Sequence, residues 1–283
     1  MSAIEILYQN VRGLRTKLED FCVNVSLSEA DLFAITETGC NDSIKDAELV
    51  PPGYKIIRCD RADGRKQGGA CLVAIPRFEL RRAPILSDVI LDNQVFELVA
   101  ASVYLRDRFL FLCCVIYIPP KSSETDYMVM FRLIEQYCNS YSDVLVVGDF
   151  NLYSASVTVN NYFEYFITYC GFTQSNKVEN NIGRSLDLVL STGDSDSVSV
   201  SAATPLVRLD PAHPALGVRA QLARRSESAA GGPLSRPGPA PSASIPTAPV
   251  RWNFHKANFA LRSVPGEMES HSSRPGSEGE GVK

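Results

Sequence analysis

Short apolar segments, each followed by polar residues, recur throughout residues 1–222 and constrain the fold more than any other feature. Their length and their content of branched and aromatic residues are typical of buried strands. Apolar residues recur at helical spacing in only three stretches, residues 14–25, 124–138 and 157–170. The expected strands are IEILYQNV, DLFAITET, YKIIRCD, GGACLVAI, QVFELVAASVYL, RFLFLCCVIYI, DVLVVGDFNL, SLDLVLS, SVSVSAA and PALGVRAQL. Many strands and few helices favour two mostly antiparallel sheets packed face to face with helices outside, rather than a doubly wound parallel sheet.

Two local features can be placed within this pattern. The strands QVFELVAASVYL and RFLFLCCVIYI are expected to form a hairpin that turns at Arg106–Asp107. In the helix expected over residues 124–138, the spacing predicts one buried face. This face consists of Val129, Phe131, Leu133, Ile134 and Tyr137.

The composition changes sharply after Gln221. Residues 226–249 contain six prolines and three glycines and have too little apolar surface to form a core. A short linker-like patch, VRWNFHKANFAL at residues 250–261, follows and carries the single tryptophan. We therefore expect one folded domain over residues 1–222 and a disordered tail over residues 223–283.

The two parts of the chain also differ in charge. Residues 1–222 contain 20 Lys and Arg against 27 Asp and Glu, a net charge of −7, whereas residues 223–283 carry +3. A domain with this net negative charge is not expected to bind nucleic acid through its overall charge. Contact with DNA would therefore need a local basic patch. The segment RCDRADGRK, with Arg58, Arg61, Arg65 and Lys66, is one candidate, and a solvated loop is the alternative.

The settings of the cysteines and the N-terminal sequence favour an intracellular location. Most of the eight cysteines lie within apolar segments, and none is arranged as C-x-x-C or in a Cys/His cluster with zinc spacing. No run of eighteen apolar residues is present, and the sequence MSAIEILYQN does not resemble a secretion signal. We expect an intracellular protein without structural zinc and without a membrane partner.

Polar residues that could bind a metal or take part in catalysis follow several of the expected strands. A carboxylate in such a place is usually a turn or cap residue, and a lone histidine is more often structural or exposed than catalytic. The convergence of many such residues at strand ends nevertheless favours a sheet-based site. They are Asn10, Glu37, Tyr117, Asp149, Asn151, Asp187, Asp210 and His213.

The segment VVGDFN carries the strongest of these signals. Gly148 is expected to permit a close backbone approach, and Asp149 and Asn151 are expected to project from the same side of the strand. A carboxylate and an amide placed in this way suit a water nucleophile and a phosphoryl oxygen. Glu37 supplies a hard oxygen ligand, which favours Mg²⁺ over zinc.

Eight segments together resemble a known family. The segments ILYQNVRGLRTK, LFAITET, YKIIRCDR, GGACLVAI, VIYIPP, VLVVGDFN, RSLDLVLS and HPAL occur in the order found in the exonuclease–endonuclease–phosphatase superfamily. Over residues 4–222 the chain is similar to this superfamily, and YQNVRGLRTK looks most like the endonuclease domain of non-LTR (LINE-type) retrotransposon proteins. The resemblance implies a four-layered α/β sandwich. It also implies a nuclease that uses Mg²⁺, with Mn²⁺ as a substitute, to nick one strand of double-stranded DNA, and that is nuclear when it acts on chromosomal DNA.

The resemblance also implies individual roles. Glu37 would bind the metal with the help of Asn10, and Asp210 is carried over as a further metal ligand. Asp149 and Asn151 would act on the attacking water and the scissile phosphate, and Tyr117 would contact that phosphate. Asp187 would hold His213 in the required tautomer. Arg12, Arg58, Arg61, Arg65 and Lys66 would contact DNA.

Two departures from the family pattern affect these roles. Gly39 and Cys40 stand where family members often carry a bulky aromatic residue. The family usually ends in adjacent Asp-His, whereas here Ala212 precedes His213 and the nearest acid is Asp210. This D-x-x-H-P form is either a tolerated variant or the loss of one carboxylate from the site.

Alternatives of origin and of function remain open. The patch at residues 250–261 resembles the segment that joins endonuclease to reverse transcriptase, yet the chain has no Asp-Asp pair typical of a reverse transcriptase. A truncated element, a host-retained gene and an incomplete gene model all fit. A catalytically inactive relic that acts as a DNA-binding or interaction fragment is one functional alternative. A phosphatase or phosphodiesterase acting on a substrate other than DNA is the second, supported by the acidic charge.

Overall fold

The computed structural model describes residues 3–61, 67–84, 95–193 and 195–221, all within one compact unit, Met1–Arg236. The expected tail and its linker-like patch lie outside the described residues, so the domain boundary at residue 222 stays a prediction. Among the helices of the described part, none is both long and apolar enough to cross a membrane.

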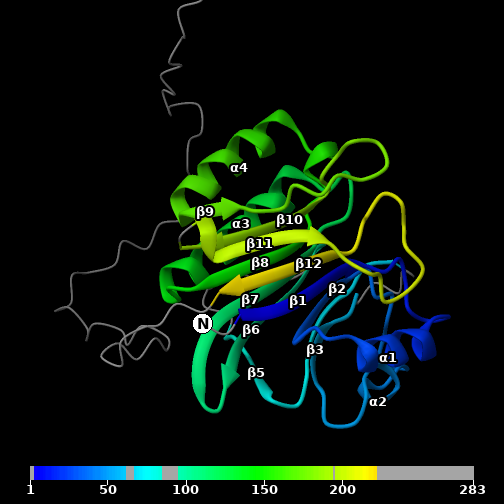
Figure 1. Cartoon of the computed structure of the whole chain (residues 1–283). Helices are drawn as coiled ribbons and strands as arrows, with labels where there is room; N and C mark the ends of the chain where they lie inside the picture. The colour runs from blue at the N-terminus through cyan, green and yellow to red at the C-terminus, as the bar shows by residue number, and fades with distance from the viewer. Residues whose placement is uncertain (1–2, 62–66, 85–94, 194, 222–283) are drawn as a thin grey trace, which may run out of the picture. The chain divides into compact units, whose positions relative to one another are not determined.

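Two six-stranded sheets form the centre of the domain (Figure 1). In each sheet four strand pairs are antiparallel, and one pair, β1/β2 or β7/β8, is parallel. The first sheet contains, in spatial order, β11 (Val198–Ala202), β12 (Leu216–Gln221), β1 (Ala3–Asn10), β2 (Leu32–Thr36), β4 (Ala70–Ala74) and β3 (Lys55–Cys59). The second contains β5 (Phe78–Arg82), β6 (Glu97–Leu105), β7 (Arg108–Tyr117), β8 (Val144–Asp149), β10 (Asp187–Thr192) and β9 (Phe172–Gln174). The expectation of two mostly antiparallel sheets is confirmed.

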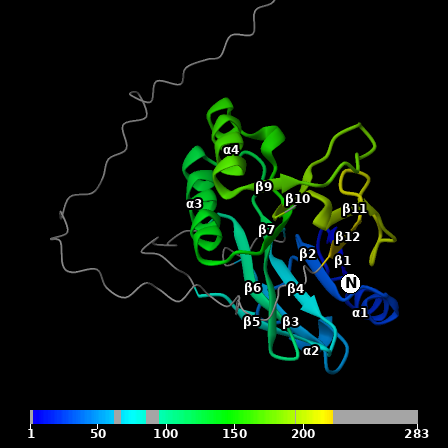
Figure 2. The same ribbon diagram turned by 60° about the vertical axis from the view of Figure 1, so that its left-hand side comes forward.

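Helices cover the outer face of each sheet, so the domain has four layers (Figure 2). On one side, α1 (Leu18–Leu27) and α2 (Asp46–Leu49) pack against the first sheet through an apolar cluster that includes Phe21 and Phe33. On the other, α3 (Glu124–Ser140) and α4 (Val157–Cys170) pack against the second sheet. A third apolar cluster fills the space between the sheets. Because the central strands are buried on both faces, their sequences read as continuous apolar runs.

The two local predictions have different outcomes. The β6–β7 hairpin turns at Arg106 and Asp107, whose φ angles of 48° and 62° are those that a tight two-residue hairpin turn requires. The expected buried face of α3 is confirmed at Phe131, Leu133, Ile134 and Tyr137 and is wrong at Val129, which is only partly buried. The buried stripe instead passes through Tyr127 and Met130, one helical turn apart, and Val129 lies beside it.

The two parallel strand pairs bring polar residues to one edge of the sandwich. Asn10 and Thr36 are neighbours at the ends of β1 and β2, and Tyr117 and Asp149 are neighbours at the ends of β7 and β8. Since parallel strands end on the same side of a sheet, these ends form a common edge. Asp187, the first residue of β10, pairs with Asp149 and joins the same edge from the antiparallel direction.

Gly148 allows the second sheet to close at this edge. A Cβ atom at Gly148 would overlap the carbonyl oxygen of Ile116 on β7 and would lie 2.8 Å from its carbonyl carbon. The predicted close backbone approach is therefore confirmed, and it sets β8 against β7 one residue before Asp149.

Candidate active site

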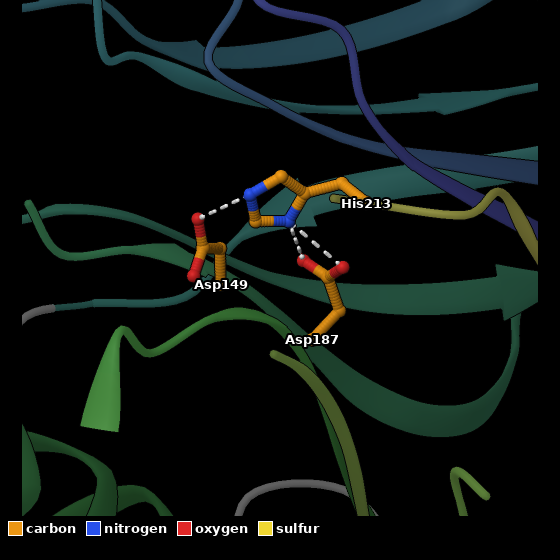
Figure 3. Close-up of side chains that lie close together, drawn as sticks. All are labelled: Asp149, Asp187 and His213. Carbon is orange, nitrogen blue, oxygen red and sulfur yellow. Dashed lines mark hydrogen bonds and ion pairs between the residues drawn. The ribbon is translucent and has the colours of Figure 1, made fainter. Parts of the chain in front are cut away.

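A buried Asp187–His213 pair lies at the centre of the polar edge (Figure 3). His213 Nδ1 donates to the two carboxylate oxygens of Asp187 at 3.1 and 3.0 Å. The hydroxyl of Tyr8 donates to the Asp187 Oδ1 atom at 2.6 Å, so two donors hold this carboxylate in place. Because Nδ1 is occupied, the second ring nitrogen, Nε2, faces the site, 3.8 Å from Asp149 Oδ2.

Burial and charge control the protonation of this group in the metal-free protein. Burial raises the pKa of Asp149, and the nearby charge of Asp187 raises it further. Burial lowers the pKa of His213, but the hydrogen bond to Asp187 and the charges of Asp187 and Asp149 outweigh it and raise the pKa to about 9. The pKa of Tyr8 is also raised, first by burial and then by Asp187, so its hydroxyl remains a donor. The contact with Asp187 therefore favours the protonated imidazole in the metal-free protein.

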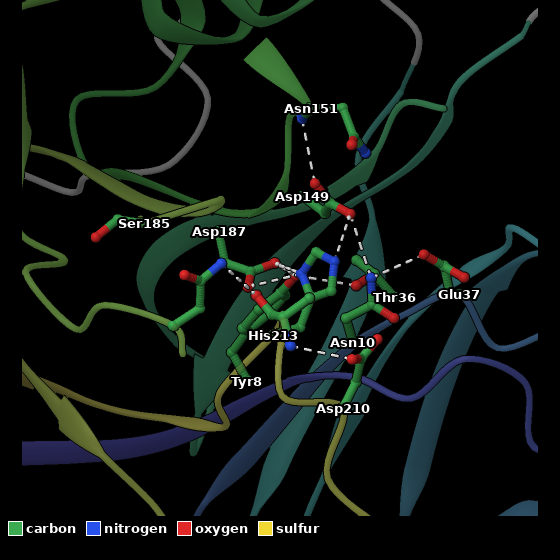
Figure 4. A network of polar contacts seen from close by, with 12 residues as sticks. Tyr8, Asn10, Thr36, Glu37, Asp149, Asn151, Ser185, Asp187, Asp210 and His213 are labelled. Carbon is green, nitrogen blue, oxygen red and sulfur yellow. Dashed lines mark hydrogen bonds and ion pairs between the residues drawn. The ribbon is translucent and has the colours of Figure 1, made fainter. Parts of the chain in front are cut away.

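Asn10 connects Glu37 to Asp149 (Figure 4). Its side-chain Nδ2 donates to Glu37 Oε1 at 2.9 Å and to Asp149 Oδ2 at 3.2 Å. Its Oδ1 accepts from the backbone N–H of Arg12, which fixes the orientation of the amide. Glu37 follows β2 with a φ of 53°, a left-handed backbone that turns the chain out of the strand and leaves the side chain buried at the edge.

Asn151 reaches the site in a different way from the one expected. The chain leaves β8 at Asp149, and Asn151 has a left-handed φ of 45°, so the alternation of strand side chains does not place it. Its backbone N–H donates to Asp149 Oδ1 at 3.1 Å, and its side-chain Nδ2 donates to the carbonyl of Ile118 at 2.9 Å. Asn151 therefore lies beside Asp149 because of a turn, and not because both residues share one face of a strand.

Tyr117 adds a protonated hydroxyl to the edge. Burial raises its pKa above that of a free tyrosine, and the charges of Glu37 and Asp149 raise it further. The guanidinium carbon of Arg61 lies 5.8 Å from the centre of the Tyr117 ring, and the tyrosine itself is buried, with 4% of its surface exposed. A phenol kept neutral in this way can donate a hydrogen bond to a phosphate oxygen.

The donor atoms at the edge fit a divalent cation. One atom each from Asp149, Asp187 and His213 can be chosen so that all three lie within 4.8 Å of one another, and these residues are buried. Asp187 is already held by His213 and Tyr8, so the carboxylate oxygens that remain for an ion are those of Glu37 and Asp149, which Asn10 Nδ2 joins. Three buried carboxylates face a single imidazole, and an added cation would offset their repulsion. Oxygen ligands of this kind suit a hard metal ion.

Asp210 makes other contacts. Its Oδ2 is 3.0 Å from Arg12 Nη1, and its Oδ1 accepts from the backbone N–H of Ala212. Its carbonyl accepts from the backbone N–H of His213, which closes the turn through Pro211. These contacts favour a role in shaping the His213 turn, and the proposal that Asp210 binds metal gains no support from them.

The basic residues expected to contact DNA are divided by the structure. Arg58 forms ion pairs with Asp46 and Asp60, and Arg61 with Glu97 at 2.5 Å, so nearby carboxylates offset both charges. Arg65 and Lys66 lie outside the described residues. Arg12 is 60% exposed next to Asp210 and keeps a surface position near the site.

Two features at the edge were not anticipated. Tyr8 lies two residues before Asn10 on the same side of β1, so strand periodicity could have identified it as a neighbour of the site. The buried Asn180 joins the loop before β10 to the carbonyl of Ala212, a contact between distant segments that no local pattern indicates.

Gly39 and the buried Cys40 occupy the segment after Glu37, where Gly39 has a φ of 62° and its carbonyl accepts from Arg15.

Comparison with known proteins agrees with this architecture. The sequence profile of the Endonuclease/Exonuclease/phosphatase family matches residues 7–209. The chain belongs to this family. The match contains Asn10, Glu37, Tyr117, Asp149 and Asp187 of the polar edge, and His213 follows four residues after its end. Members of this family are hydrolases that act on phosphodiester bonds, and the chain has their fold. No curated protein matches the chain in sequence.

Several solved structures superpose on most of the chain. The endonuclease domain of TRAS1, a telomere-specific non-LTR retrotransposon, is 14% identical with a TM-score of 0.57 and covers 78% of this chain and 99% of its own. The AP endonuclease LMAP from Leishmania major is 12% identical with a TM-score of 0.58 and covers 77% and 88%. The 3′-5′ exonuclease NExo from Neisseria meningitidis is 14% identical with a TM-score of 0.57 and covers 77% and 100%. At these identities the likeness concerns the fold.

Proposed function

We propose that this family member is a Mg²⁺-dependent DNA endonuclease of the kind found in non-LTR retrotransposons. The observation that carries the proposal is the arrangement of the polar edge. Residues from distant parts of the sequence form one connected network there, in which Asn10 links Glu37 to Asp149 and Asp187 orients His213 toward the same carboxylate. Carboxylates, an amide, a phenol and an imidazole with raised pKa form a suitable set for phosphodiester hydrolysis.

The roles follow from the contacts. Asp149 orients the attacking water and accepts its proton, while the oxygen of that water bonds to phosphorus. The bond from phosphorus to the 3′ oxygen breaks, and the released 3′ oxygen takes a proton from solvent to become the 3′-hydroxyl. The protonated His213, held by Asp187, donates through Nε2 to the phosphate, and Asn151 and Tyr117 position its other oxygens. A divalent cation held by Glu37 and Asn10 would supply positive charge against the charge that develops on the phosphate.

The retrotransposon type rests on separate support. The segment YQNVRGLRTK resembles that class, and the fold is similar to the TRAS1 endonuclease domain over nearly the whole of that domain. Double-stranded DNA is the proposed substrate, and Mg²⁺, with Mn²⁺ as a substitute, is the proposed metal. A nick that leaves a 3′-hydroxyl is the proposed product.

One observation favours a second candidate. Residues 1–222 carry a net charge of −7, and Arg58 and Arg61 are paired with carboxylates. A phosphodiesterase acting on a small, non-nucleic substrate of the same reaction class would need less positive surface than a DNA nuclease.

Nicking of supercoiled plasmid tests the proposed function. The full chain should convert supercoiled to open-circular plasmid in Mg²⁺ and not in EDTA, and Asp149→Asn should reduce the rate at least about a hundredfold, as expected for a group that acts in the transition state. Asp143→Asn, which changes an acid in the loop before β8, serves as the matched control and should nick like the wild type. Equal nicking by Asp149→Asn, or hydrolysis of small phosphodiesters without plasmid nicking, contradicts the proposal.

A further inference from the structure

Two loops that carry site residues are joined at the protein surface by a stacked pair of side chains. The guanidinium carbon of Arg184 lies 3.6 Å from the centre of the Tyr153 ring. Tyr153 lies in the short 3-10 helix η1 (Leu152–Ser154), two residues after Asn151, and Arg184 lies three residues before Asp187. Tyr153 remains 68% exposed with Arg184 stacked on it. The pair therefore presents an exposed aromatic ring and a guanidinium on two segments that lead directly, along the chain, to the site residues Asn151 and Asp187.

The loop that carries Arg184 is fixed to the His213 turn. The side chain of the buried Asn180 accepts from the backbone N–H groups of Ile182 and Arg184, both at 3.0 Å. The same side chain donates from Nδ2 to the carbonyl of Ala212 at 3.1 Å, next to His213. Arg184 is thus held at a defined place relative to His213, and Tyr153 relative to Asn151, as a preorganised binding surface requires.

The chemistry of the pair indicates the kind of ligand. An exposed cation–π pair contributes only about 0.5–1 kcal/mol to folding, so stability gives little reason to leave a tyrosine ring at this position. Aromatic rings and arginine planes bind nucleobases by stacking, with little dependence on sequence. An inositol or lipid phosphate has no flat π-face to stack on the ring. A nucleobase is therefore the ligand that fits the pair.

We propose that Tyr153 and Arg184 form a stacking platform for the nucleobase that flanks the scissile phosphate in DNA. This inference rests on the proposed function and specifies its substrate as a nucleic acid whose base is held beside the bond to be cut. Phosphate would bind at the polar edge and the adjacent base on the platform, so the two together would set the position of cleavage.

Steady-state nicking of a labelled duplex by platform variants gives the first test. Tyr153→Ala should raise KM roughly five- to hundredfold, the effect expected for one lost stacking contact, with a smaller change in kcat. Tyr153→Phe should retain the wild-type KM because the ring alone stacks, and Arg184→Gln should lie between the two. The matched control is Tyr165→Ala, which removes a tyrosine that is 51% exposed on α4 and should not change KM.

Substrates with a single abasic spacer identify the base. The spacer replaces, one position at a time, each nucleotide flanking the cleaved bond. At one position the spacer should lower the affinity of the wild type for the duplex. The same spacer should not lower the affinity of Tyr153→Ala further, because the substitution and the missing base remove the same contact. Additive losses at every position, or a Tyr153→Phe variant as weak as Tyr153→Ala, overturn the platform while the nuclease proposal stands.

Failure of the proposed function gives a different result. If the wild type does not cut the duplex at all, the nuclease proposal fails, and equilibrium binding of the same duplexes in Ca²⁺ tests the platform by itself. Equal affinity of the wild type and Tyr153→Ala then overturns the platform, whereas the same spacer-dependent loss supports it as a DNA-binding feature of an inactive protein.

Discussion

At the scale of single residues, the site depends on how Asp187 is held. Tyr8 donates to one of its oxygens, and His213 donates to both, so the carboxylate is fixed from two sides in a buried position. The pKa of His213 is raised to about 9 despite burial, because this carboxylate and Asp149 stabilise the imidazolium. The hydrogen bonds to Asp187 therefore both orient the imidazole of His213 and favour its protonated form.

Asp187→Asn should lower the pKa of His213. In the metal-free wild type we expect the imidazole to titrate near pH 9, and in the variant at a clearly lower pH, since burial continues to disfavour the charged ring while the hydrogen bond and the charge of Asp187 are lost. Nuclear magnetic resonance of the histidine ring protons measures both values. A His213→Gln sample identifies the signal, because the chain has two other histidines.

The same shift has a defined effect on stability. Because the pKa of His213 is higher in the folded than in the unfolded protein, its protonation stabilises the fold fully below pH about 6.5, and this contribution is lost as the pH rises towards 9. Asp187→Asn should remove this dependence. An unchanged titration in the variant contradicts the assigned pairing.

At the scale of elements, the ends of strands determine which residues meet. Apolar runs followed by Asn10, Glu37 and Asp149 marked those ends in the sequence, because buried strands need apolar side chains and the chain turns polar where it leaves the core. The position of Asn151 could not be obtained in this way. Its left-handed turn depends on a hydrogen bond from its amide to the carbonyl of Ile118, the residue that follows β7, and strand alternation does not describe this contact.

Gly148→Ala tests the close approach of β7 and β8. The added methyl group would overlap the backbone of Ile116, which cannot move without separating the strands, so we expect unfolding free energy to fall by about 1–3 kcal/mol or more. Gly217→Ala on β12 is the matched control, because its Cβ would meet neighbours at ordinary contact distances of 3.5 Å and beyond. Urea denaturation measures both. Equal stability of the two variants contradicts the account of this strand pair.

At the scale of the whole molecule, negative charge gathers at one edge of an already acidic domain. Asp149, Asp187 and Glu37 are buried there, and the domain carries seven more acidic than basic residues over residues 1–222. Such a site is expected to gain stability from a bound cation.

Mg²⁺ should therefore raise the melting temperature of the wild type, in a saturable way. Glu37→Gln removes a proposed metal ligand and should abolish most of this increase, since the other oxygens hold the ion less tightly. Glu48→Gln, a change at an exposed residue of α2, is the matched control and should retain the increase. Thermal unfolding by circular dichroism across a Mg²⁺ titration provides the measurement. The same increase in all three proteins would mean that the ion binds elsewhere.

The limits of sequence reasoning are also clearest at this scale. The spacing of apolar runs was enough to predict two layered sheets, because each strand reports its own burial. Long-range pairing was not predictable: Arg61 and Glu97 are separated by 36 residues, and RCDRADGRK therefore looked like a free basic segment. The hydrogen bond from Asn180 to the carbonyl of Ala212 was not predicted for the same reason, since no local sequence pattern indicates a contact that forms only on folding.

The ends of the cleaved strand test the central claim most directly. An end-labelled duplex incubated with an excess of the full chain in Mg²⁺ should give fragments with 3′-hydroxyl and 5′-phosphate ends. His213→Ala should lower the single-turnover rate by about a hundredfold or more. No cleavage by the wild type, 3′-phosphate ends, or an equal rate in EDTA would contradict the account.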